Sequence, residues 1–162
     1  MDLTGHYQNA YVTCDLDRTL AMLEREFGLA DFALFAGEVT VDTAEGLKPA
    51  SLRIANRWVG GTNIELVEPV SGAIEHYCSM LPADRSDPAP RLHHVALRRD
   101  DLGAMHAEIA ASLFEVAFSG KPPGMVFAYL DTRLALGHYL ELVWKESGGW
   151  DKIGWPEAKP AT

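Results

Sequence analysis

Two glutamates lie in otherwise apolar segments of this chain and could do chemistry there. Glu65 lies in IELVEP and Glu141 in YLELVW, and Leu-Val follows each of them. A carboxylate among buried apolar residues is costly unless it is paired or binds a metal. An edge position facing water explains one such residue equally well, but two in equivalent contexts favour a shared site.

A glutamine and a histidine occupy matching places upstream of these glutamates. An Asp-Leu pair follows Gln8 at 15–16, and another follows His94 at 101–102. The sequence distance is the same in both cases. A lone strand histidine is more often structural than a ligand, and a glutamine carbonyl binds divalent metals only weakly. The repetition favours a ligand set of one amide oxygen, one imidazole and two carboxylates, which suits Zn²⁺, Ni²⁺, Co²⁺, Mn²⁺ or Fe²⁺.

The matching positions indicate an internal repeat of one supersecondary unit. In the first half, a strand at 7–14 precedes a helix that Asp15 can cap and Gly28 can end. Three strands are then expected, at 31–42, 50–59 and 62–70. The second half repeats this order, with a helix after Asp101 and strands at 93–99, 114–118, 125–132 and 137–144. Both halves therefore predict β-α-β-β-β.

This repeat divides the chain into a first module (5–70), a linker (71–90), a second module (91–146) and a C-terminal tail (147–162). The linker begins with a short helix at 71–80 and continues into a Pro- and Asp-rich stretch without regular structure. We expect Trp150 and Trp155 of the tail to pack on the domain or on a partner subunit, and the last residues to fray.

The composition is that of an ordinary soluble globular protein, with 162 residues, 48% apolar and 23% charged. A net charge of −9 argues against binding to nucleic acid or to an anionic membrane. Cys14 and Cys78 have no spacing typical of a zinc site, and no disulfide is expected. No signal peptide or transmembrane segment is recognisable, so we expect a cytoplasmic protein that acts on a small molecule.

The pattern resembles the vicinal oxygen chelate superfamily, which includes glyoxalases, bleomycin resistance proteins, methylmalonyl-CoA epimerases and extradiol dioxygenases. The likeness covers residues 5–146. The segment HHVALRRDDL is similar to the family's second-module opening, and GHYLELVW to its closing strand. YQNAYVTCDL matches the first opening more loosely, with Gln8 where histidine is commoner.

This resemblance implies an α+β fold of two paired βαβββ modules, whose strands form a cup-shaped sheet around a metal site. It places the ligands of a divalent ion (Zn, Ni, Co, Mn or Fe) at Gln8, Glu65, His94 and Glu141. The glyoxalase I and epimerase branch uses such an ion to bind neighbouring substrate oxygens and to stabilise an enolate-like intermediate. By that resemblance the protein is a lyase, isomerase or epimerase, and a homodimer is expected, although a monomer could close its own cup.

In that branch, glutamate ligands themselves serve as acid and base. Glu141 is then the first choice for the general base, and Glu65 for its partner on the opposite face of the substrate. Strand alternation places Tyr139 on the face of Glu141, and Arg98 on the face of His94, where it could hold a carboxylate or phosphate. The simpler explanations are that Tyr139 fills the interior of the cup and that Arg98 lies at a solvated strand end.

The wall of the cup is expected to be mixed, and Tyr129 is a further candidate for substrate contact. Apolar and aromatic side chains available to line it include Trp58, Met125, Phe127 and Leu130. Strand alternation also sends His93 to the face opposite His94.

Two other functions stay open. The first is a non-catalytic binding protein of the same fold, similar to antibiotic-sequestering members, although those typically lack the full ligand set. The second is an iron-dependent ring-cleaving dioxygenase. This function fits less well, because an iron(II) oxygenase requires two histidines and one carboxylate as iron ligands.

Overall fold

The computed structural model describes residues 1–154. The first half contains β1 (His6–Val12), α1 (Leu16–Phe27), β2 (Ala33–Thr43), β3 (Gly46–Val59) and β4 (Thr62–Gly72). A short α2 (Glu75–Cys78) follows in the linker. The second half contains β5 (Arg91–Arg99), α3 (Leu102–Ala110), β6 (Val116–Gly120), β7 (Met125–Leu130), α4 (Arg133–Leu136) and β8 (Tyr139–Lys145), before α5 (Gly149–Lys152). The β-α-β-β-β order predicted for each half is confirmed.

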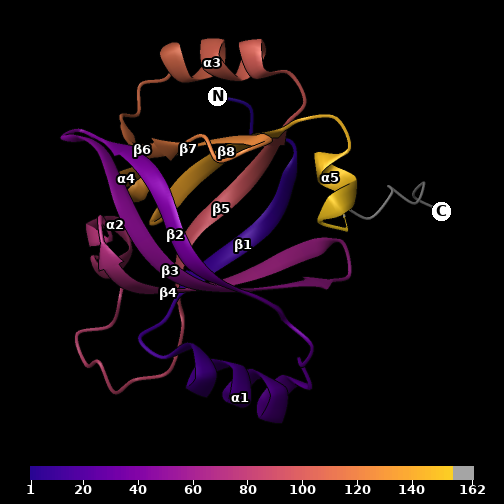
Figure 1. Cartoon of the computed structure of the whole chain (residues 1–162), viewed down its shortest axis with the longest axis vertical. Coiled ribbons are helices and arrows are strands. Elements are labelled where there is room, and N and C mark those ends of the chain that lie inside the picture. Colours follow the sequence, from indigo (N-terminus) through magenta and orange to yellow (C-terminus); the bar gives the residue numbers. More distant parts are fainter. Residues whose placement is uncertain (155–162) are drawn as a thin grey trace.

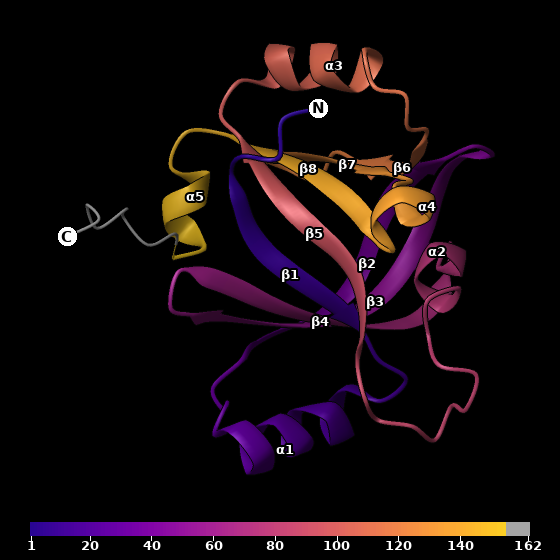
Figure 2. The same cartoon turned by 180° about the vertical axis from the view of Figure 1, so that it is seen from behind.

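The eight strands form one closed barrel in the order β1-β4-β3-β2-β6-β7-β8-β5 (Figures 1 and 2). Each module pairs its first and last strands in parallel, β1 with β4 and β5 with β8, and its other strands antiparallel. The modules join through the long antiparallel β1–β5 pairing on one side. On the other side β2 meets β6 through the single pair Asp42–Ser119. The predicted α+β fold is confirmed, and a single chain closes the cup.

The two long helices cover opposite outer faces of the barrel (Figure 1). Asp15 caps α1 by accepting a hydrogen bond from the Arg18 backbone N–H, and Gly28 ends it in the left-handed conformation. Leu16 of α1 is buried against Ala55 and Leu66 on the outside of the first module. Each helix thus buries one apolar stripe against its own module.

The helix of the second module follows the same plan. Asp101 caps α3 by accepting from the Ala104 backbone N–H, and Met105 of α3 is fully buried against the outside of β5, β7 and β8. Leu130 belongs to this outer cluster rather than to the cup wall, so its predicted position was wrong. Alternation along β7 turns Phe127 and Tyr129 inward and Leu130 outward.

Two β-bulges interrupt the pairing of β1 with β5, one in each strand. Gln8 pairs with Ala96 and His6 with Leu97, which leaves Tyr7 as an extra residue on β1. In β5 the extra residue is His93, because its neighbours His94 and Leu92 pair with Ala10 and Tyr11. A bulge of this kind re-aims a side chain that strict alternation would send to the other face. The predicted outward orientation of His93 was therefore wrong.

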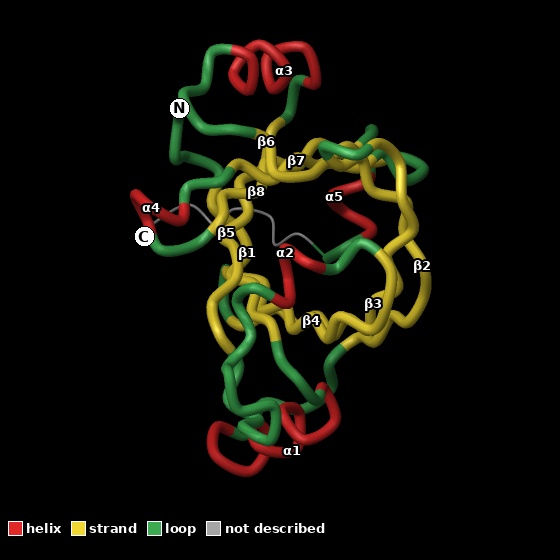
Figure 3. The backbone as a smooth tube through the Cα atoms, turned by 90° about the vertical axis from the view of Figure 1, so that its left-hand side faces the viewer, coloured by secondary structure: helices red, strands yellow, loops and turns green. Residues whose placement is uncertain are grey.

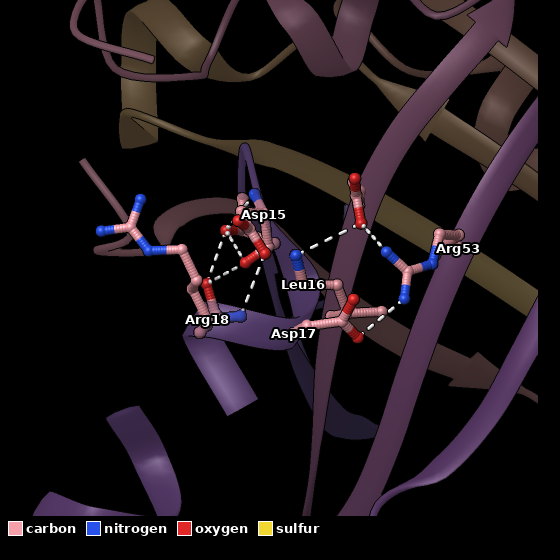
Figure 4. Close-up of polar contacts among 8 residues, drawn as sticks. Asp15, Leu16, Asp17, Arg18 and Arg53 are labelled. Atoms are coloured by element: carbon pink, nitrogen blue, oxygen red, sulfur yellow. Dashed lines mark hydrogen bonds and ion pairs between the residues drawn. The ribbon is translucent and has the colours of Figure 1, made fainter. Parts of the chain in front are cut away.

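The start of α1 is fixed to the sheet by an ion-pair network (Figure 4). Glu68 Oε2 on β4 accepts from the Leu16 backbone N–H at 3.2 Å and from Arg53 Nη1 at 2.7 Å. Arg53 Nη2 also donates to Asp17 Oδ1 at 2.8 Å. One carboxylate thus satisfies a free N–H at the helix N-terminus, where negative charge is favoured, and neutralises a half-buried arginine.

Short helices lie at the two ends of the barrel (Figure 3). Tyr77 of α2 enters the interior at one end, and residues 152–153 at the end of α5 lie at the other. Trp150 packs edge-on against Tyr7, with ring centroids 5.1 Å apart, so it packs on the domain as predicted. Trp155 and the fraying predicted for the last residues lie outside the described part of the chain. Among residues 1–154, no helix has the length and hydrophobicity of a membrane span.

We predict that Glu68→Ala lowers the free energy of unfolding by about 1–2 kcal/mol, because it leaves Arg53 and the helix N-terminus without their shared acceptor. Urea denaturation checks this. The control is Glu45→Ala, which removes only an ion pair with Lys48 at an exposed turn and should change stability by less than about 0.5 kcal/mol. Equal effects of the two substitutions would contradict the anchoring role.

Candidate active site

The four residues predicted to ligate a metal meet inside the barrel. His94 Nε2 lies 3.3 Å from Glu141 Oε2 and 3.7 Å from Glu65 Oε1. The Gln8 amide donates from Nε2 to Glu65 Oε2 at 3.3 Å and to Asn63 Oδ1 at 2.9 Å. Four different strands supply these side chains, two from each module. The sequence repeat therefore becomes a single cluster.

Strand register explains why the two halves contribute equivalent positions. Glu65 on β4 pairs with Ala10 on β1, and Glu141 on β8 pairs with Ala96 on β5. Both alanines are fully buried, and their small side chains leave room for the carboxylates of the neighbouring strands. Because β1 and β5 lie side by side, the two glutamates approach His94 from opposite sides.

The two carboxylates are held in a largely water-free environment. The side chain of Glu65 is 15% exposed and that of Glu141 is 9% exposed. Burial and the nearby Glu141 charge raise the pKa of Glu65 from 4.5 to about 7, even though His94 and hydrogen bonds from Asn56 and Gln8 act in the opposite direction. Glu65 can therefore gain and lose a proton near neutral pH.

The bulge at His93 gives His94 a hydrogen-bonding partner on its far side. The Nδ1 atoms of the two rings lie 2.9 Å apart and share one proton. Burial lowers the pKa of His93 well below its ordinary value, so His93 is neutral and able to accept. Which ring donates depends on the tautomers, and in either case the contact holds the His94 ring with Nε2 toward the carboxylates.

Neutral tyrosines complete the polar part of the site. Tyr129 Oη lies 3.4 Å from His94 Nε2. Burial, and then the charges of Glu141 and Glu65, raise the pKa of Tyr7 and of Tyr129 well above the ordinary value. Burial likewise raises the pKa of Tyr77, which stacks on His93 at 4.7 Å between ring centroids. These phenols stay protonated and can donate hydrogen bonds.

The cluster forms part of the wall of a cavity of about 480 Å³, which is within the usual size of a small-molecule site. Much of the wall is apolar or aromatic, as predicted, and includes Trp58, Met125, Phe127 and Tyr129. Gln8, Glu65 and Glu141 also line the cavity. A ligand in this space would therefore meet the two carboxylates.

Two of the residues predicted to contact substrate lie elsewhere. Arg98 does not line the cavity: its Nε pairs with Asp100 at 2.7 Å and its guanidinium lies 4.9 Å from the centroid of Trp150. Tyr139 is fully buried in the apolar cluster of the interior but does not line the cavity, and the Arg133 guanidinium lies 4.7 Å from the centroid of its ring. Of the three candidates, Tyr129 alone lines the cavity.

Tyr7, Asn63 and Lys145 are among the polar cavity residues that were not singled out from the sequence. Two signals could have found them. Tyr7 stands to Gln8 as His93 stands to His94 in the repeat, and alternation places Asn63 with Glu65 and Lys145 with Glu141 on their strands. To identify Tyr7 from the sequence, one would also have had to recognise the β-bulge in β1.

The donors of the cluster are the kind that bind a divalent ion, but they are not arranged as a preformed metal site. Within residues 1–154, no three His, Cys, Asp or Glu side chains form a group that could hold an ion as they stand. Gln8 presents its NH₂ to Glu65. A half-turn of that amide would present its oxygen instead.

Comparisons with known proteins identify the fold. No protein-family model matches the chain, and a search of curated proteins gives no matching sequence. Among solved structures, a variant of methylmalonyl-CoA epimerase from Streptomyces coelicolor in complex with 2-nitronate-propionyl-CoA is 18% identical, over 90% of this chain and 97% of that chain, with a TM-score of 0.57.

Two further solved structures have the same architecture. Methylmalonyl-CoA epimerase from Mycobacterium tuberculosis is 16% identical over 96% of this chain and 97% of that chain, with a TM-score of 0.55. A hypothetical protein from Bacillus halodurans C-125 is 17% identical over 90% of this chain and 97% of that chain, with a TM-score of 0.60. The chain therefore has the fold of these solved structures, as its resemblance to the vicinal oxygen chelate superfamily predicts.

The raised pKa of Glu65 predicts a pH-dependent stability of the metal-free protein. The folded state binds a proton more tightly than the unfolded state, so this contribution to stability is complete below pH 4.5 and is lost as the pH rises through about 7. The expected loss in the free energy of unfolding is about 3 kcal/mol. Glu65→Gln should abolish it, as measured by urea denaturation between pH 4.5 and 8 with a chelator present.

The control for this prediction is Glu38→Gln, on the exposed face of β2. Glu38→Gln should leave the pH profile of the wild-type protein unchanged. A Glu65→Gln profile that parallels that of the wild type would contradict the raised pKa.

Proposed function

We propose that this protein is a metal-dependent isomerase or epimerase of the glyoxalase-like type, which moves a proton on a carbon next to a carbonyl group. One observation carries the proposal. Two carboxylates from different modules, Glu65 and Glu141, line one cavity and lie 3.7 and 3.3 Å from the Nε2 atom of the buried His94. Two carboxylates with a substrate carbon between them can remove a proton on one side and return one on the other.

The donor set supports binding of a divalent ion. Metal–ligand bonds of about 2.0–2.2 Å place neighbouring ligand atoms roughly 3.0–3.6 Å apart, similar to the separations around His94 Nε2. Gln8, Glu65, His94 and Glu141 would hold the ion. When bound, a divalent ion acts as a Lewis acid that stabilises the negative charge developing on the substrate oxygens.

The protein's own residues would then move the proton. Glu65 and Glu141 approach His94 from opposite sides, which supports one of them as the group that accepts the proton and the other as the group that returns it. The neutral Tyr129 hydroxyl can donate to an oxygen of the substrate. The apolar wall formed by Phe127, Met125 and Trp58 excludes water, which strengthens each electrostatic interaction in the site.

The solved relatives suggest the first substrate to test. Structures of methylmalonyl-CoA epimerase contain methylmalonyl-CoA or 2-nitronate-propionyl-CoA. For this chain we propose an acyl thioester with an acidic carbon next to its carbonyl group. The cavity of about 480 Å³ would take the acyl part and leave the larger thiol carrier outside.

We predict that the purified protein binds about one divalent ion per chain. His94→Ala and Glu141→Ala should each weaken binding at least about 100-fold, because each removes a ligand. Calorimetric titration with Zn²⁺, Co²⁺ and Mn²⁺ measures this, and His106→Ala, on the exposed face of α3, serves as the control. Unchanged affinity in both cluster variants would contradict the metal assignment.

We also predict that the metal-loaded protein catalyses exchange of the α-proton of methylmalonyl-CoA with solvent. In D₂O, mass spectrometry should show deuterium uptake that falls at least about 100-fold in Glu65→Gln and in Glu141→Gln, since each removes a proton carrier. Glu38→Gln should behave as wild type. If methylmalonyl-CoA binds but its α-proton does not exchange, a non-catalytic ligand-binding protein explains the structure better. Consumption of oxygen would instead favour the dioxygenase.

A further inference from the structure

Lys145 is a cation in the cavity wall that the proposed chemistry does not use. It lies on β8 with its side chain on the same face as Glu141 and Val143, and all three line the cavity. Four residues of strand separate Lys145 from Glu141, which corresponds to about 13 Å between their backbone positions. The backbone of Lys145 thus lies well away from that of Glu141 along the cavity wall.

The protein gives this ammonium group only weak partners. Nζ lies 2.9 Å from Met125 Sδ and 5.7 Å from the centroid of Trp150. Within residues 1–154, no carboxylate oxygen lies within 4.0 Å of it. A thioether is a poor acceptor, and a partly buried cation without an anion is costly. Burial accordingly lowers the pKa of Lys145, against the raising effect of Glu141 and Glu65.

A second lysine also lines the cavity, but a carboxylate offsets its charge. Lys152 of α5 also lines the cavity, and its exposed Nζ lies 3.6 Å from Glu146 Oε1. The chain as a whole carries a formal charge of −9. Of these two lysines, Lys145 is the one that has no carboxylate within 4.0 Å in the described part of the chain.

We infer that Lys145 is the anion-recognition residue of the cavity, and that the ligand carries a carboxylate or phosphate group remote from the carbon that lies between Glu65 and Glu141. The inference rests on the proposed function only in that both place the ligand in the same cavity. It limits the substrate class to acyl compounds with a second, anionic end. The missing partner of Lys145 is then supplied by the ligand.

Calorimetric titration with succinate and with inorganic phosphate tests this, each in the protein with and without one equivalent of Zn²⁺. The wild-type protein should bind at least one of the two anions in both forms, and the tighter one identifies the group as carboxylate or phosphate. Lys145→Met keeps the length of the side chain and removes its charge, and it should weaken binding at least about tenfold. Lys145→Arg keeps the charge and should retain binding within about threefold.

Lys121→Met is the matched control, since it removes the same charge from an exposed residue outside the cavity wall. Wild-type affinity in Lys145→Met, or no binding of either anion by the wild type, would overturn the inference. These outcomes are separable from failure of the proposed function. Lys145-dependent binding without proton exchange overturns only the reaction, and proton exchange with unaltered anion binding in Lys145→Met overturns only the anion site.

Discussion

The structure depends on the burial of two carboxylates inside an apolar barrel. Desolvation of a carboxylate in such surroundings is expensive, and here Glu65 and Glu141 also repel one another. The interactions that offset this cost come from His94, Gln8 and the hydrogen bonds around them. A cluster that is costly in the metal-free protein is one that a bound cation would stabilise, and this is the physical basis of the proposed function.

Both modules are needed to build the cluster. A single βαβββ module would place one carboxylate on its last strand and one donor on its first, but it would leave both open to solvent. The antiparallel β1–β5 pairing brings the two half-sites together, and closure of the barrel shields them. The two bulges in that pairing add Tyr7 and His93 to the interior. The inward shift of His93 gives His94 a partner for Nδ1 and leaves its Nε2 facing the carboxylates.

Much of this could be predicted from the sequence, because the relevant signals are local or repeated. Asp15 and Gly28 bound the first helix as their capping preferences indicate. The shared spacing of Gln8 and His94, and of the two Glu-Leu-Val segments, predicts which side chains meet. Strand alternation fails at β-bulges, since nothing in the residues around His93 indicates an extra residue in one strand of a pair. The position of Arg98 depended on packing of α5, a contact between distant segments that periodicity does not encode.

The most direct test is anomalous diffraction from crystals of the protein grown with Zn²⁺ or Co²⁺, recorded at the absorption edge of the metal. We expect one strong peak per chain inside the barrel, within bonding distance of His94 Nε2 and of carboxylate oxygens from both Glu65 and Glu141. The side-chain amide oxygen of Gln8 should turn toward the same point. Metal bound only to surface carboxylates, with the interior cluster unchanged, would contradict the central claim that this barrel is built around a metal-binding site.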